Sequence, residues 1–277
     1  MAKRPGKHTP FFELVDAQHL AGCAVCRLAY RSTDRYLDML LYEAVLDPTV
    51  RAKLKASRGF CQRHVAMLHA RPGRSLGVAL IYESVLRQIT DSVAEGGLER
   101  AGWRERLRGQ AATGGPLGQR LSPTEECPAC RTEREAEQLY ARLMADTIED
   151  ERLAAAYADG DGLCVPHLSM VLGCVSDEET LRRLLTPQIA RYRAMLADLA
   201  EYIRKSDHRF RHEAMGEEGD VWLRVMNTVA GGAGLGTTAR HGGRRSDDLM
   251  EASRPPDRSA TSAERGGGQT PAGHESA

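Results

Sequence analysis

Aromatic side chains, net charge and long apolar runs are all scarce in this 277-residue chain. Aromatic residues make up only 5% of it, so the core must be built mainly from Leu, Ala, Val, Ile and Met, residues that favour helices. Lys plus Arg and Asp plus Glu both number 38. The resulting absence of net charge argues against a broad phosphate-binding face for nucleic acid.

A secretory signal and a membrane span are also missing from the pattern. The basic N-terminus is not followed by an apolar run, because Glu13, Asp16 and Gln18 interrupt it. No window approaches the roughly 18 apolar residues that a membrane span needs. We therefore expect a cytoplasmic protein that does not cross a membrane. In that reducing compartment the seven cysteines are expected to be metal ligands or redox thiols, and not a disulfide framework.

Apolar residues recur at helical spacing along most of the chain, and no stretch alternates convincingly as a strand would. We predict an all-α fold with helices over residues 26–46, 49–57, 61–70, 75–95, 133–158, 167–175, 177–205 and 221–230. The helices are expected to form two related modules, 1–95 and 124–230. A Gly-rich linker at 96–123, holding a short helix around Trp103, would join them, and a disordered tail would follow at 231–277.

Two sets of four Cys and His residues occur at nearly the same spacing in the two halves: Cys23, Cys26, Cys61 and His64, then Cys127, Cys130, Cys164 and His167. In each half a CxxC motif precedes a CxxH motif, with 34 residues between them in the first half and 33 in the second. Gly59 and Gly162 precede the two CxxH motifs at matching positions. This correspondence indicates an internal duplication.

Three thiolates and one imidazole are a ligand set that tetrahedral zinc sites use. Each motif places its two ligands about one helical turn apart, at an expected helix N-terminus where free N–H groups and the helix dipole stabilise thiolates. Pro128 and Pro166 suit a first turn, and Gly59 and Gly162 permit a sharp turn. We expect a helix and its return to bring the CxxH of each half beside the CxxC of the same half. The sequence thus predicts two structural zinc sites, one within each half.

Other interpretations of these residues remain open. Single cysteines are often small core residues, and a single histidine is often only a satisfied polar group. The CxxC motifs are also found in thiol–disulfide proteins, although that motif expects a βαβ context. Three Cys and one His could instead hold an iron–sulfur cluster. Structural zinc is preferred because its sites are closed by four protein ligands.

Two features lie outside the duplicated set. Cys174 stands in the apolar run MVLGCV and is expected to be a core residue. The segment DHRFRHE, Asp207 to Glu213, combines two histidines and two arginines with acidic residues and could bind an anion or a third metal. A solvated helix end is the preferred interpretation, since mixed charge runs are usually surface.

The arrangement CxxC … GFCxxH, followed by the apolar helix LGVALIYESVL, resembles an uncharacterised bacterial family classed as a domain of unknown function. The resemblance is clearest over residues 20–90 and returns over 125–212, where SDHRF is similar to a segment near the end of family members. It does not cover the tail from residue 231. The resemblance implies a bacterial protein with a helical fold and carries no established activity.

These residues are compatible with three functions. The first is a non-catalytic zinc-binding protein with an interaction or regulatory role, because four protein ligands leave no coordination position for a substrate. The second is an iron–sulfur or thiol-based redox sensor. The third is a metalloenzyme in which Asp207–Glu213 supplies acid and base groups. A protein partner fits the first function, whereas the neutral charge disfavours nucleic acid and the sequence leaves the oligomeric state open.

Overall fold

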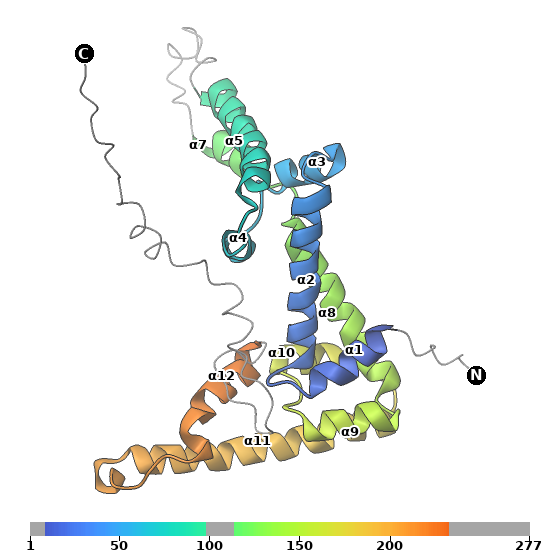
Figure 1. The fold of residues 1–277 in the computed structure, drawn as a ribbon, viewed down its shortest axis with the longest axis vertical. Helices are drawn as coiled ribbons and strands as arrows, with labels where there is room; N and C mark the ends of the chain where they lie inside the picture. The colour runs from blue at the N-terminus through green and yellow to red at the C-terminus, as the bar shows by residue number, and fades with distance from the viewer. Residues whose placement is uncertain (1–8, 98–113, 233–277) are drawn as a thin grey trace, which may run out of the picture.

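The computed structural model describes residues 9–97 and 114–232, which are largely helical and contain no β-strand (Figure 1). The predicted all-α class is therefore confirmed. The α-helices are α1 (Thr9–Gln18), α2 (Ala24–Glu43), α3 (Pro48–Ala56), α4 (Gln62–His69), α5 (Ser75–Gly97), α7 (Gly114–Leu121), α8 (Pro128–Thr147), α9 (Glu151–Asp159), α10 (Val165–Leu172), α11 (Glu178–Ser206) and α12 (Val221–Ala230). The predicted helix around Trp103 and the predicted tail beyond residue 232 lie outside the described residues.

The helices follow the same order of lengths in the two halves. Helices α2 and α8 have 20 residues each, α3 and α9 have nine, and α4 and α10 have eight. The long helices α5 and α11 come next in each half. Helix α2 begins at residue 24 and α8 at 128, 104 positions apart, while α4 begins at 62 and α10 at 165, 103 positions apart. The helices therefore keep the same spacing as the Cys and His motifs.

Three elements differ from the prediction. Residues 133–158 form parts of two helices, because the Asp150 side chain accepts a hydrogen bond from the backbone N–H of Arg152 and starts α9. Helix α7 lies inside the predicted linker. Helix α1 was not predicted, although its apolar face, which includes Phe11 and Leu14, is buried in the core. Tertiary packing stabilises this ten-residue helix, which is short for an isolated helix in water.

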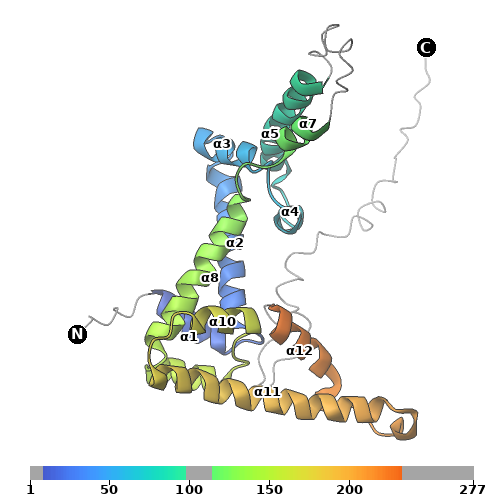
Figure 2. The ribbon, with the colours of Figure 1, turned by 180° about the vertical axis from the view of Figure 1, so that it is seen from behind.

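Helices α2 and α8 pack side by side and antiparallel, as both views show (Figures 1 and 2). Leu37 and Leu40, late in α2, share a core cluster with Ala129 at the start of α8. Leu28, early in α2, shares the other cluster with Met144, late in α8. A helix of 20 residues is about 30 Å long, so the two clusters lie at opposite ends of the pair. The division into modules 1–95 and 124–230 stays a prediction.

The two ends of this helix pair carry different sets of helices. Helices α3, α4, α5 and α7 lie at one end, and α1, α9, α10, α11 and α12 lie at the other (Figure 2). At the second end the buried side chain of Gln188 accepts hydrogen bonds from the Tyr157 hydroxyl at 2.8 Å and the Leu163 N–H at 3.1 Å, and donates to the Leu163 carbonyl at 2.9 Å. Gln188 therefore anchors the turn that leads into Cys164.

The outer face of α11 leaves apolar side chains uncovered at seven-residue intervals. Ile189, Leu196 and Ile203 are 42%, 64% and 67% exposed. Residues seven apart lie on the same side of a helix, so the three side chains form one stripe. No helix of the described part of the chain combines the length and the apolar character needed to cross a membrane.

Replacing Gly162 with alanine is expected to destabilise this second end by about 1–3 kcal/mol. Gly162 has a φ of +78°, and a Cβ there would lie 2.6 Å from the Gln188 side-chain oxygen. The matched control is Gly173→Ala, where the backbone is right-handed helical and the nearest atoms lie 3.4 Å away. Urea unfolding of the two variants measures the difference, and equal midpoints would contradict the expectation.

Candidate metal centres

All four Cys motifs begin at helix N-termini, as predicted. Cys23, Cys61, Cys127 and Cys164 are the N-cap residues of α2, α4, α8 and α10. The second Cys or His of each motif is then the third residue of the same helix. Both predicted ligands of a motif therefore lie at the helix end where backbone N–H groups are free. The partial positive charge of the helix N-terminus stabilises thiolate sulfur there.

The turn before each CxxH motif also has the predicted backbone. Gly59 has a φ of +86° and Gly162 a φ of +78°, both in the left-handed region that glycine adopts without strain. Pro128 and Pro166 lie in the first turns of α8 and α10. Local sequence therefore sets the backbone conformation at three of the four motifs.

The eight predicted ligands form two groups, and each group combines residues from both halves. Within a group the ligand atoms all lie within 4.8 Å of one another. We name the groups after the helices that carry them. The α2–α10 site contains Cys23, Cys26, Cys164 and His167, and the α4–α8 site contains Cys61, His64, Cys127 and Cys130. The predicted pairing of CxxC with CxxH inside each half is therefore wrong.

The antiparallel packing of α2 and α8 explains why each CxxC motif meets the CxxH motif of the other half. Cys23 and Cys26 lie at the start of α2, and the helix carries the chain about 30 Å away before α3 and α4 follow. The N-terminus of α8 packs at that far end, so Cys127 and Cys130 meet the CxxH motif of α4. The chain then returns along α8, and α9 and α10 bring Cys164 and His167 to the start of α2.

The two groups have similar internal distances. In the α2–α10 site the Sγ atoms of Cys26 and Cys164 are 3.7 Å apart, and the Nδ1 of His167 lies 3.2–3.5 Å from the three sulfurs. In the α4–α8 site the Sγ atoms of Cys61 and Cys130 are 3.6 Å apart. The Nδ1 of His64 lies 3.2–3.6 Å from the three sulfurs there. In both sites, Nδ1 is the ring nitrogen that faces the sulfurs.

These distances fit a single tetrahedral ion. Bonds of about 2.3 Å to sulfur and about 2.0 Å to nitrogen imply S···S separations of about 3.8 Å and S···N separations of about 3.5 Å. A disulfide would need sulfurs only about 2.05 Å apart. The residues present are thus compatible with metal binding at both sites.

The protonation of the ligands opposes metal binding in acid. Burial raises the pKa of the Cys23 thiol, but hydrogen bonds with Cys164, Cys26 and His167 outweigh it and hold that pKa well below the ordinary value. Burial lowers the pKa of His167, yet its bonds to Cys164 and Cys23 raise it to about 12. Burial, followed by contact with Cys61, raises the pKa of Cys130 to about 12. A metal ion must displace the protons of His167 and Cys130, so the affinity for metal should fall as the pH falls.

The C-terminal end of α12 closes over the α2–α10 site. Gly231 has a φ of +90°, and a Cβ there would lie 3.6 Å from the Cys164 sulfur. The next residue, Gly232, donates its backbone N–H to the Cys26 sulfur at 3.2 Å. Both glycines lie in the segment 231–277, which the sequence predicts to be a disordered tail. The signal that could have found them is the Gly-Gly pair directly after an apolar helix, since glycine commonly follows a helix C-terminus.

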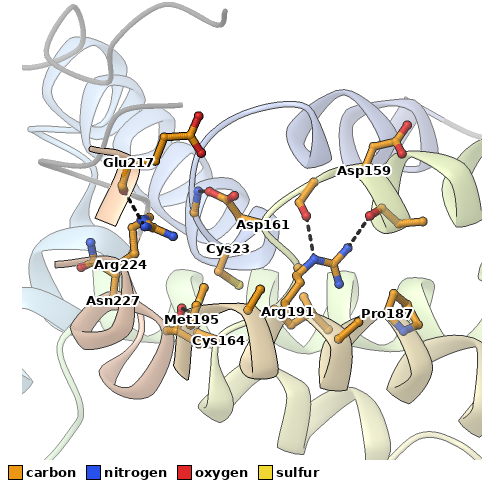
Figure 3. A pocket seen from close by; sticks show the side chains of 18 residues that line it. Cys23, Asp159, Asp161, Cys164, Pro187, Arg191, Met195, Glu217, Arg224 and Asn227 are labelled. Carbon is orange, nitrogen blue, oxygen red and sulfur yellow. Dashed lines mark hydrogen bonds between the residues drawn. The ribbon is translucent and has the colours of Figure 1, made fainter. Parts of the chain in front are cut away.

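A cavity of about 760 Å³ adjoins the same site, and Cys23 and Cys164 belong to its wall (Figure 3). Arg191 and Arg224 lie on its two sides (Figure 3). Arg191 donates to the carbonyl of Gly160 at 2.7 Å, and Arg224 forms ion pairs with two carboxylates, at 2.7 and 3.1 Å. The Nη1 atom of each guanidinium group is buried and has no hydrogen-bond partner among the described residues.

The two sequence features outside the duplicated set, Cys174 and the segment Asp207–Glu213, lie largely at the surface. Cys174 is exposed, so the prediction that it is a core residue is wrong, because α10 ends at Leu172 and Cys174 falls in the turn beyond it. In the segment Asp207–Glu213, His208 has an 81% exposed side chain and Arg209 pairs with Asp207. Over the described ranges, this segment joins no third metal-binding group.

Comparison with known proteins identifies relatives without an assigned activity. The model of a family of unknown function, DUF6062, matches residues 9–234. An uncharacterized 23.9 kDa protein in the xynA 3'region of Caldicellulosiruptor sp. (strain Rt8B.4) is 26% identical over 211 residues, covering 76% of this chain and 95% of that protein. No solved structure matches the chain.

Proposed function

The chain belongs to the family of unknown function DUF6062, and we propose that it is a two-site structural zinc protein that acts through protein contacts. One observation carries the proposal: two closed Cys3His groups each join a helix of one half to a helix of the other. A metal ion in each group would tie the two ends of the α2–α8 pair, so metal binding and folding would be coupled.

Zinc is the proposed metal because of the types of donor atom and the small size of each group. Three thiolates and one imidazole within 4.8 Å of one another surround one ion and leave little room for several bridged irons. Three thiolates on Zn²⁺ leave one net negative charge, which the N-termini of two helices offset at each site. The matching helix lengths support an internal duplication as the origin of the two sites.

An interaction role is favoured over catalysis by two features. Four protein ligands complete a tetrahedral shell and leave no open position for substrate, as in structural zinc sites. The exposed stripe of Ile189, Leu196 and Ile203 offers apolar area of the kind that protein contacts cover. Regulation of a partner protein through such contacts fits both features.

Metal content tests the proposal. Protein purified anaerobically without added metal is expected to contain close to two equivalents of zinc by mass spectrometry and to be colourless. A brown protein with iron and acid-labile sulfide would contradict the zinc assignment and favour the iron–sulfur alternative. A metal-free protein with free thiols would contradict both and favour a thiol-based role.

A further inference from the structure

Each ligand histidine has its second ring nitrogen beside a glutamate of α8. The Nε2 of His64 lies 3.6 Å from a carboxylate oxygen of Glu133, and the Nε2 of His167 lies 3.3 Å from one of Glu137. Both imidazoles are nearly fully buried, with 1% and 6% of the side chain exposed. Since Nδ1 faces the sulfurs in both sites, Nε2 is the nitrogen left to carry a proton toward the carboxylate.

The two glutamates do not follow the duplication. In the α4–α8 site, Glu133 lies three residues after the ligand Cys130 on the same helix. The corresponding position after Cys26 is Ala29, which is buried and carries no carboxylate. Glu137 serves the α2–α10 site instead, although α8 contributes no ligand to that site. It can do so because α8 packs along α2.

We propose that Glu133 and Glu137 are positioning residues for the two metal centres, an inference that rests on the metal sites proposed above. The Glu137 carboxylate lies within hydrogen-bond distance of the Nε2 of His167, and the Glu133 carboxylate lies just beyond that distance from the Nε2 of His64. Each negative charge favours the tautomer and orientation in which Nε2 carries the proton and Nδ1 faces a metal. The two residues are four apart on one helix, so a single turn of α8 supports both centres. Arg63 also contacts Glu133 and helps to hold it in place.

Cadmium-113 NMR of the full chain tests the assignment site by site. Two cadmium resonances are expected for the wild type, each assigned by its loss in His64→Ala or His167→Ala. Glu137→Ala should perturb only the resonance of the α2–α10 site, and Glu133→Ala only that of the α4–α8 site. Competition with a chelator should show the affinity of the affected site reduced about 10–100-fold.

The matched control is Glu135→Ala, an exposed glutamate on the same helix between the two positions. It should leave both resonances and both affinities at wild-type values. The isosteric Glu137→Gln, which keeps an acceptor oxygen without the charge, should restore part of the lost affinity and covers the case in which the alanine variant does not fold. Wild-type affinity in both Glu137→Ala and Glu137→Gln would overturn the inference. A wild-type chain that binds no metal would instead overturn the proposed function.

Discussion

Stripping both metal ions from the purified protein is expected to abolish its cooperative thermal unfolding and much of its helical circular dichroism. Structural zinc contributes on the order of 10 kcal/mol per site in small peptides, and whole domains are stable by only about 5–15 kcal/mol. Each ion would join helices from different halves of the chain. Its loss would leave three thiols and an imidazole close together without the metal ion that holds them. The measurement is a thermal melt followed at 222 nm before and after dialysis against a strong chelator.

Add-back experiments show whether the loss is specific. Two equivalents of Zn²⁺ should restore the melt, whereas Mg²⁺ should not, because thiolate ligands disfavour hard cations. An unchanged melting curve after complete metal removal would contradict a structural role for the metal. The fold would then depend on its apolar clusters alone.

Double substitutions are expected to reveal the exchanged pairing of ligands as a change in zinc stoichiometry. Cys23→Ser with His167→Ala removes two ligands of the α2–α10 site, so the α4–α8 site should still hold close to one equivalent. Cys23→Ser with Cys61→Ser removes one ligand from each site and should leave little bound zinc. Pairing inside each half would produce the opposite result, because Cys23 and Cys61 would then share one site. Metal analysis of the two purified variants therefore separates the two arrangements.

The control for this experiment is Cys174→Ser, which removes an exposed thiol that belongs to neither group. It should keep two equivalents of zinc and the wild-type melting temperature. If a double variant is insoluble, the single substitutions Cys23→Ser and His167→Ala should still abolish the same cadmium resonance. Loss of different resonances in those two variants would contradict the exchanged pairing.

Much of the candidate site could be predicted because its determinants are local. The two ligands of each motif are three residues apart, which brings them to one helix N-terminus, and Cys23 and Cys164 indeed cap α2 and α10. The positive φ of Gly59 and Gly162 likewise follows from a turn that only a few residues define. The helical class follows from apolar periodicity in the same way.

Contacts between distant segments could not be predicted by the same reasoning. The hydrogen bond from Gly232 to Cys26 and the approach of Glu137 to His167 join residues that are 206 and 30 positions apart. The burial of α1 likewise depends on distant residues such as Met144 and Leu153, which share its core cluster. Cys174 shows the reverse error, since its apolar neighbours suggested burial while the end of α10 left it in an exposed turn.

By itself the sequence determined which eight Cys and His residues are candidate metal ligands, that they occur in pairs at helix N-termini, and that the fold is helical. Only the tertiary structure decided which pairs meet. A separation of 33 or 34 residues allows a CxxH motif to return to its own CxxC or to reach another. The choice depends on the apolar faces of α2 and α8, which pack antiparallel and place each CxxC beside the CxxH of the other half.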